Sequence, residues 1–253
     1  MFQIDLNADL GEASGPWELS PDRELLGLVS SASIACGSHA GDPILMRRTA
    51  AEAGRLGVTV GAHPGYPDRT GFGRRDMNAT PAEVGAYVAY QVGALMGCAA
   101  AEGVRVRYVK PHGALYNRAA RDAAAARAIA DAVRAVDSSL AILALAGSAL
   151  ADAARAVGLR AVPEAFLDRG YADDGSLLPR DRPGAVIDDP DAAAERALRL
   201  ARDGAVAAGD GSMLRIQAES YCVHGDGPNA AELLRAVRAR LGAAGIAIAP
   251  FIR

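Results

Sequence analysis

Short apolar segments alternate with helical patterns along the whole chain, and this alternation limits the fold more than any other feature. Strands that alternate with helices pair in parallel, so the pattern predicts an α/β fold. Seven such units in 253 residues predict a distorted TIM-like (β/α)7 barrel that forms a single domain over residues 1–253. The predicted strands begin near Ile4, Ser33, Thr59, Val106, Ala141, Ala161 and Met213.

A doubly wound open sheet is the alternative fold. Its dinucleotide-binding form requires a G-x-G-x-x-G motif after the first strand, and the segment after Leu10 lacks this motif. Two long glycine-rich loops, residues 64–78 and 168–184, interrupt the regular pattern. Loops of this length inside a compact domain are usually functional, often as lids.

Several segments carry the residues that are typical of a helix start. Ser20-Pro21, Asp42-Pro43 and Asp189-Pro190 each place a capping residue before a proline at the first helical position. Thr80 and Glu83 have the spacing of a capping box.

Charge and composition exclude several classes of protein. The net charge of -3 offers no basic surface for nucleic acid or for a membrane. The first residues lack the pattern of a signal peptide, and no apolar run approaches the roughly 20 residues that span a bilayer. An odd number of cysteines, 3, without short spacing fits a reducing compartment. We therefore expect a cytoplasmic protein that acts on a small molecule.

Lysine is almost absent from the chain. Of the 27 basic residues, only Lys110 is a lysine, which indicates a coding bias that replaces exposed lysines by arginine. A lysine kept against this bias indicates a need for an ammonium group, which is compact and has a tunable pKa. Chance survival is the alternative explanation.

The first predicted strand carries acidic residues on one face. Alternation places Asp5, Asn7 and Asp9 on the face that points into the barrel, shortly before Glu12. Buried carboxylates require a partner, a proton or a metal, and close carboxylates suit acid–base chemistry. For Asp5 and Asp9, a supporting hydrogen-bond network is the alternative.

The four histidines, His39, His63, His112 and His224, all follow predicted strands. Because strand ends of a (β/α) barrel meet at one rim, we expect these side chains to converge there. Lys110 shares a strand face with His112, Glu164 shares one with Asp168, and His224 shares one with Asp226. His224 with Asp226 is either an oriented base or a neutral histidine satisfied by its neighbour.

Anion and metal binding also have candidates. His39 precedes a helix N-terminus, and Arg74 and Arg75 lie on the first long loop, where arginines bind phosphate or merely solvate a surface. Asp9, His39 and His63 are candidates for a metal site, although their spacing is a weak signal. The phosphate-binding pattern G-x-x-x-x-G-K-[ST] is absent from the sequence.

Together these motifs resemble the LamB/YcsF family, whose members form one of three subunits, the A-type, of prokaryotic 5-oxoprolinases. Ser38 and the segment 219–221 depart from the family pattern and put the fine fit of the substrate in question. The matching stretches, in family order, are DLNADLGE (5–12), SIACGSHAGDP (33–43), GAHPGYPD (61–68), FGRR (72–75), VKPHGALYN (109–117), EAFLDRGY (164–171), DGSLLPR (174–180) and CVHGDG (222–227).

The resemblance implies a barrel related to glycoside hydrolases and deacetylases. It also implies hydrolysis of 5-oxo-L-proline to L-glutamate, coupled to ATP hydrolysis to ADP and phosphate, by a complex with separate subunits B and C. A divalent metal such as Mg²⁺ would then enter with ATP. The candidate catalytic residues are Asp5, Asp9, Lys110, His112, Glu164 and His224. The candidates for substrate or phosphate binding are Asn7, Glu12, His39, His63, Arg74, Arg75, Asn117, Asp168, Arg169 and Asp226.

Two rival functions remain open on the sequence alone. A metal-dependent deacetylase or amidohydrolase of the same barrel type would act without ATP and would bind a divalent metal tightly. A non-catalytic scaffold protein would tolerate the loss of the polar residues at the rim.

Overall fold

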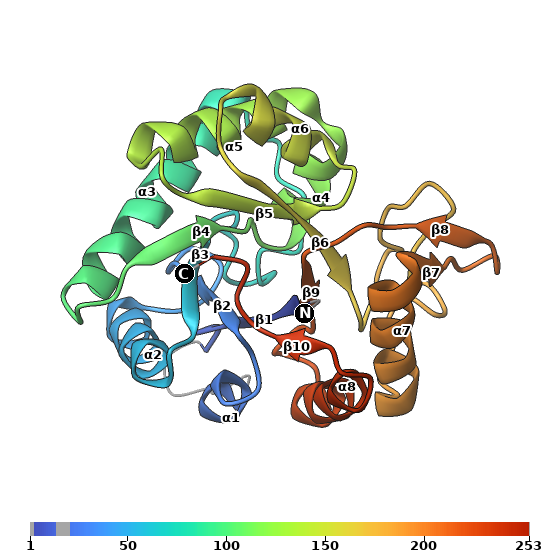
Figure 1. Cartoon of the computed structure of the whole chain (residues 1–253). Helices are drawn as coiled ribbons and strands as arrows, with labels where there is room; N and C mark the ends of the chain where they lie inside the picture. The colour runs from blue at the N-terminus through green and yellow to red at the C-terminus, as the bar shows by residue number, and fades with distance from the viewer. Residues whose placement is uncertain (1–2, 14–20, 253) are drawn as a thin grey trace.

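Seven parallel strands close into a barrel in the computed structural model, which describes residues 3–13 and 21–252 (Figure 1). Each strand pairs with the next along the ring, and β1 and β9 pair to close it, with Asn7 opposite Cys222. The barrel strands are β1 (Gln3–Leu10), β2 (Ser31–Ala35), β3 (Thr59–His63), β4 (Val106–Val109), β5 (Ala141–Leu145), β6 (Ala161–Phe166) and β9 (Ser220–Cys222). The predicted (β/α)7 barrel is therefore confirmed, and the open sheet is excluded.

Helices surround the barrel and cover the apolar outer faces of its strands (Figure 1). Two helices, α4 and α5, follow β4, whereas most strands are followed by one. The helices are α1 (Asp22–Leu26), α2 (Pro43–Leu56), α3 (Pro81–Ala100), α4 (Gly113–Arg121), α5 (Ala123–Val136), α6 (Ala149–Ala156), α7 (Pro190–Asp203) and α8 (Ala230–Ala243).

Strand β1 shows the alternation that the sequence predicts. Leu6, Ala8 and Leu10 belong to the apolar core between barrel and helices and are fully buried. The intervening Asp5, Asn7 and Asp9 are also buried but bond to polar partners inside the barrel. One strand thus supplies the apolar outer layer and part of the polar interior.

An aromatic layer fills the amino-terminal end of the barrel. Tyr108 is fully buried there, and its ring centroid lies 5.2 Å from that of Phe251. A Cβ atom at Gly61 would lie 2.2 Å from the Tyr108 ring, so only glycine at this position lets the ring occupy its place. The short strand β10 (Ala247–Ile248) pairs with β1 at the same end.

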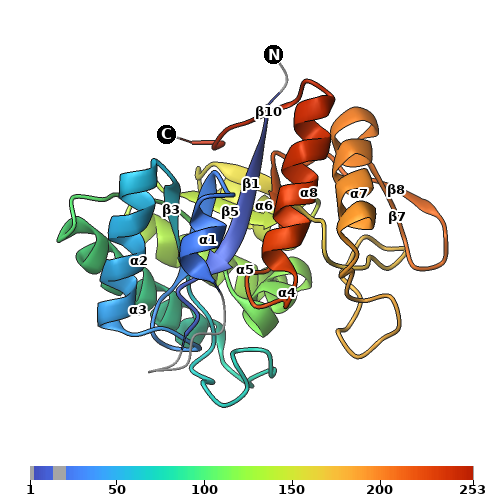
Figure 2. The same cartoon turned by 90° about the horizontal axis from the view of Figure 1, so that it is seen from below.

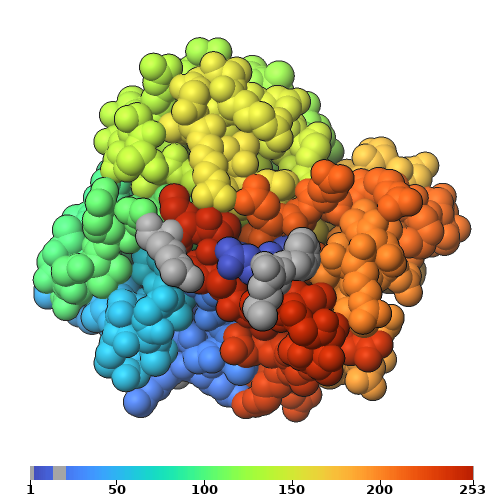
Figure 3. Space-filling view, in the orientation of Figure 1, coloured from blue at the N-terminus to red at the C-terminus, as the bar shows by residue number. Residues whose placement is uncertain are grey.

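The predicted start of the seventh strand near Met213 is wrong. Residues Met213–Arg215 form β8, which pairs antiparallel with β7 (Ala205–Ala207) outside the barrel. This hairpin and α7 belong to the orange lobe on the right of Figure 3. The barrel position is taken by β9, whose three residues are all buried, whereas β8 is largely exposed.

The local helix signals behave as the sequence indicates, with one exception. The Asp42 side chain caps α2, Asp189 caps α7, and Thr80 forms the capping box with Glu83 at α3. At α1, Pro21 is the N-cap and the helix begins at Asp22, so Pro21 is not the first helical residue. Ser20 lies outside the described residues.

The two long loops lie at the carboxyl ends of the strands. One runs from β3 to α3 and the other from β6 to α7. In Figure 2 both loops lie at the bottom, and β10 lies at the opposite end of the barrel. Parallel barrels place ligand sites at this carboxyl end.

Candidate active site

A cavity of about 690 Å³ opens at the carboxyl ends of the strands, and both long loops line it. Its volume is that of a pocket for a small molecule. Of the residues predicted from the sequence, those that line it are Asp9, His63, Arg74, Lys110, His112, Asn117, Arg169 and His224.

Lys110 forms a buried charge cluster at the floor of the cavity. Its Nζ atom lies 2.9 Å from Asp9 Oδ1 and 2.9 Å from Glu164 Oε1, and it donates to Asn7 Oδ1 at 3.1 Å. Burial alone would lower the pKa of Lys110, but the neighbouring Asp9 carboxylate and the groups beside it raise it well above its usual range. The ammonium is therefore charged and compensates two carboxylates.

The contacts of Lys110 leave little room for a guanidinium. Besides the two carboxylates, Nζ lies 3.1 Å from Cys222 Sγ, and the whole side chain is only 2% exposed. Burial raises the pKa of the Cys222 thiol well above its ordinary value. Cys222 is thus a neutral core residue.

Asp5 lies below this cluster and does not line the cavity. Its carboxylate accepts hydrogen bonds from the hydroxyl groups of Ser30, Ser31 and Ser220. Burial raises the pKa of Asp5 to about 6, against the effect of these serines. The contacts match the supporting network that was the alternative interpretation of Asp5. Ser220, one of the departures from the family pattern, also accepts a hydrogen bond from Asn7.

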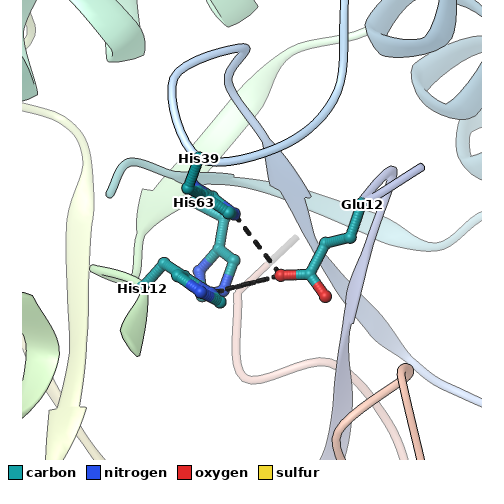
Figure 4. A group of neighbouring side chains, drawn as sticks. All are labelled: Glu12, His39, His63 and His112. Carbon is teal, nitrogen blue, oxygen red and sulfur yellow. Dashed lines mark hydrogen bonds and ion pairs between the residues drawn. The ribbon is translucent and has the colours of Figure 1, made fainter. Parts of the chain in front are cut away.

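Three histidines and Glu12 form a second buried cluster beside the cavity (Figure 4). His112 Nδ1 lies 3.0 Å from His63 Nε2, and the rings of His39 and His112 stack with centroids 3.8 Å apart. Glu12 Oε1 lies 3.2 Å from His112 Nδ1 and 3.4 Å from His39 Nε2. The four side chains come from the loops and strand ends after β1, β2, β3 and β4.

Gly73 makes this close packing of rings compatible with the loop above it. Its φ is +63°, a region that favours glycine, and a Cβ atom there would lie 2.8 Å from His39 Cβ and 2.9 Å from His112 Cδ2. The first long loop therefore presses directly on two of the histidines.

Burial sets the protonation of this cluster. It lowers the pKa of His39 to about 3 and lowers the pKa of His112, so both rings are neutral. It would lower the pKa of His63 too, but Asp9 raises it above its usual value. Burial would raise the pKa of Glu12, but the neighbouring histidines hold this pKa well below the ordinary range. An ionised carboxylate thus faces two neutral imidazoles and the more basic ring of His63.

This cluster differs from the metal site predicted from the sequence, which combined Asp9, His39 and His63. Both histidines belong to it, but Glu12 takes the place of Asp9 and His112 is added. Asp9 is instead paired with Lys110, although its Oδ2 still lies 3.4 Å from His63 Nε2. Glu12 lies beyond the end of β1, so alternation along the strand does not reveal where its side chain points.

His224 has a different partner from the one predicted. Its Nδ1 lies 2.9 Å from Asp168 Oδ2, and its backbone N–H donates to the same oxygen. Asp226 pairs instead with Arg74, at 2.8 Å. A carboxylate that bonds one ring nitrogen orients the imidazole and leaves Nε2 for chemistry. The ring also stacks on Phe166, with centroids 5.3 Å apart.

Arginines give the cavity a positive wall. Arg74, Arg169 and Arg180 all line it. Burial, with the nearby Arg180, lowers the pKa of Arg169 to about 10, which still leaves it charged at neutral pH. Arg75 is turned away: it pairs with Asp68 and does not line the cavity. Sequence reasoning missed Arg180 as a site residue, although it lies near the end of the segment 168–184 that the sequence marks as functional.

The match to a family model covers residues 4–253, described as the LamB/YcsF family. The chain belongs to this family.

Close relatives match the chain over its whole length. A protein of Agrobacterium fabrum, named as a 5-oxoprolinase A-type subunit, is 53% identical over 251 residues, which are 99% of this chain and 98% of that protein. The crystal structure of a lactam utilization protein from Thermus thermophilus is 48% identical, has a TM-score of 0.93 and covers 99% of this chain and 100% of its own.

A distant structure resembles the LamB/YcsF chain in fold alone. The catalytic domain of a peptidoglycan N-acetylglucosamine deacetylase from Eubacterium rectale is 10% identical, with a TM-score of 0.51 over 98% of this chain and 87% of its own. The deacetylase-like barrel expected from the sequence is thereby confirmed.

The other predicted residues of this LamB/YcsF chain do not line the cavity. They are Asp5, Asn7, Glu12, His39, Arg75, Glu164, Asp168 and Asp226. Most of them contact a residue that lines the cavity, as Glu164 contacts Lys110. Within the described residues, none of the helices combines the length and the apolar character that a membrane crossing requires.

Proposed function

We propose that this chain is the A-type component of an ATP-dependent 5-oxoprolinase, which hydrolyses 5-oxo-L-proline to L-glutamate together with separate subunits B and C. The observation that carries the proposal is the 53% identity, over nearly all of both chains, to a protein named as the same component of 5-oxoprolinase. The cavity adds support, because its volume and charge suit a small anionic lactam.

The substrate needs a cationic binding wall. 5-Oxo-L-proline carries a carboxylate, and a carbonyl oxygen activated by phosphorylation would add further negative charge. Arg74, Arg169 and Arg180 line one cavity and would bind these groups through charge-assisted hydrogen bonds. Half-buried Asp226 holds Arg74 in place at 2.8 Å.

Ring opening also needs groups that move protons. Water adds to the carbonyl carbon of the phosphorylated lactam, and the C–N bond breaks as the ring nitrogen takes a proton. A second water then hydrolyses the resulting acyl phosphate to glutamate and phosphate. His224, oriented by Asp168, is the residue best placed to take the proton from water and return it to the nitrogen. Lys110 lies at the cavity floor and would supply positive charge beside the oxygen that water adds to the carbonyl carbon.

ATP hydrolysis is assigned to the complex and not to this chain alone. The sequence lacks the glycine-rich P-loop, and its only lysine is held by Asp9 and Glu164 inside the barrel. We therefore expect the isolated chain to hydrolyse neither ATP nor 5-oxo-L-proline at a significant rate.

The test is glutamate release from 5-oxo-L-proline and ATP, measured for the chain alone and for the chain with subunits B and C. The full complex should be active. His224→Gln should lower the rate about 100-fold or more, the range of general acid–base catalysis, while the three proteins still copurify. Arg155→Gln is the control, because Arg155 pairs with Asp152 on the exposed face of α6. ATP-coupled turnover by the isolated chain, or full activity of the His224→Gln complex, would contradict the proposal.

A deacetylase without ATP dependence is the second candidate, and one observation favours it: the buried cluster of Glu12 with three histidines beside the cavity. Release of acetate from N-acetyl substrates by the isolated chain is its test. A scaffold role is disfavoured, because buried charges such as Lys110 with its carboxylates cost stability and are usually kept for function.

A further inference from the structure

Four polar side chains meet in the second cluster with almost no contact to solvent. Glu12, His39 and His63 are each 1% exposed, and His112 is 3% exposed. One donor atom from each of them lies within 4.8 Å of the other three. Buried polar atoms require partners, so this cluster needs a proton or an ion that satisfies its acceptor atoms.

Carbonyl oxygens define which ring nitrogens carry hydrogen. His63 Nδ1 lies 2.7 Å from the Lys110 carbonyl oxygen, and His112 Nε2 lies 2.8 Å from the Phe72 carbonyl oxygen. A carbonyl only accepts hydrogen bonds, so both of these nitrogens are protonated. In a neutral ring the other nitrogen is then a bare lone pair.

These bare nitrogens point at one another. His63 Nε2 and His112 Nδ1 lie 3.0 Å apart, so a proton or a metal ion must lie between them. Glu12 Oε1, an acceptor too, lies 3.2 Å from the second and 3.7 Å from the first. Lone pairs at such distances repel each other unless a cation lies between them.

His39 adds a second, independent observation. Neither of its ring nitrogens has a hydrogen-bond partner among the described residues, and the same is true of Glu12 Oε1. The Nε2 atom faces Glu12 Oε1 at 3.4 Å. A buried imidazole without any hydrogen bond is costly, and a ligand bond would satisfy it.

The spacing of the donors is that of a metal shell. In a tetrahedral site with bonds of about 2.1 Å, neighbouring ligand atoms lie about 3.4 Å apart. Four of the six separations between donor atoms are 3.0, 3.2, 3.4 and 3.7 Å, and all six are within 4.8 Å. Carbonyl groups that orient metal-binding histidines through the other ring nitrogen are a usual feature of such sites.

We propose that Glu12, His39, His63 and His112 bind one divalent transition-metal ion of the zinc type. Three imidazoles and one carboxylate suit Zn²⁺ and its neighbours, whereas Mg²⁺ and Ca²⁺ prefer oxygen ligands. His63 and His112 also line the cavity, so a ligand there could reach the ion.

Such an ion would supply Lewis acidity for a carbonyl group or for water. A part in lactam ring opening rests on the proposed 5-oxoprolinase function, whereas metal binding itself does not. The two parts are therefore tested separately.

The binding test uses the purified full chain without partners. Its metal content is measured by elemental analysis, and the chelator-treated protein is titrated with Zn²⁺ and with Co²⁺, whose visible spectrum reports nitrogen-rich tetrahedral coordination. We expect one ion per chain and a rise in melting temperature on adding Zn²⁺. Glu12→Gln and His63→Gln should weaken Zn²⁺ binding about 100-fold or more, above the effect of losing an outer partner.

His224→Gln is the matched control, because His224 lines the same cavity but is bonded to Asp168. It should keep wild-type Zn²⁺ affinity and the same Co²⁺ spectrum. If the folded wild-type chain carries no metal and binds neither ion, or if His224→Gln loses metal while His63→Gln keeps it, the site is refuted and a proton must bridge the cluster.

The catalytic test uses the complex with subunits B and C. Removal of the ion should abolish glutamate release, and Zn²⁺ or Co²⁺ should restore it. Full activity after verified metal removal would overturn the catalytic role. A complex that carries the metal but never releases glutamate would instead refute the 5-oxoprolinase function and leave the metal site standing.

Discussion

Substitution of Lys110 by methionine should destabilise the chain more than most single substitutions. Lys110 is 2% exposed, and its partners Asp9 and Glu164 are 3% and 0% exposed. The substitution keeps most of the side-chain volume but leaves two buried carboxylates without their cation. Breaking a buried ion pair in this way costs about 3–5 kcal/mol. For a chain of this size, the melting temperature should fall by roughly 6–20 °C.

A second substitution distinguishes the loss of stability caused by uncompensated charge from a loss caused by poorer packing. Glu164→Gln in the Lys110→Met background removes one of the two uncompensated charges and should restore part of the lost stability. The same Glu164→Gln substitution in the wild-type chain should be destabilising, because there it removes a partner from Lys110. Melting temperatures of the four proteins give the coupling between the two sites.

An exposed cation is the control for the loss of charge alone. The Arg155 side chain is 57% exposed and pairs with Asp152, so Arg155→Met should cost less than about 1 kcal/mol. The charge argument for Lys110 fails if Lys110→Met melts at the wild-type temperature, or if Glu164→Gln lowers stability equally in both backgrounds.

Two further predictions concern stability. The pKa of Asp5 is raised from 3.8 to about 6, so its stabilising contribution is present below pH 4 and is lost as the pH rises through 6. Relative to the wild type, Asp5→Asn should therefore gain up to about 3 kcal/mol between pH 4 and pH 7 in urea unfolding, and a pH-independent difference would contradict the shift. Gly61→Ala should lower stability by about 1–3 kcal/mol, because the new methyl group collides with the Tyr108 ring. Tyr108→Leu in the Gly61→Ala background should recover part of this loss, and an unchanged melting temperature of Gly61→Ala would show that the ring moves freely.

Local rules of the chain were sufficient for much of the architecture. The alternation along β1 places Asp5, Asn7 and Asp9 inside the barrel because successive side chains of a strand point to opposite faces. The caps at Asp42 and Thr80 are equally local, since the bonds span three residues. Lys110 stands out because no other lysine occurs in the chain.

Pairings between distant segments were beyond these rules. His224 and Asp226 share a strand face, yet His224 bonds Asp168, 56 residues away, and Asp226 bonds Arg74, 152 residues away. Such partners depend on how two loops fold over the rim. The alternation of side chains along a strand carries no information about the path of these loops.

The sequence by itself determined that the chain forms a parallel barrel with its histidines, its lysine and its acids at one end. The spacing of apolar residues and the helix-capping residues carry this information, because both are properties of short segments. Only the tertiary structure decided that Ser220–Cys222, and not Met213–Arg215, completes the ring. It also decided that Glu12 joins His39, His63 and His112, because closure of the barrel brings four separate chain segments within a few ångströms of one another.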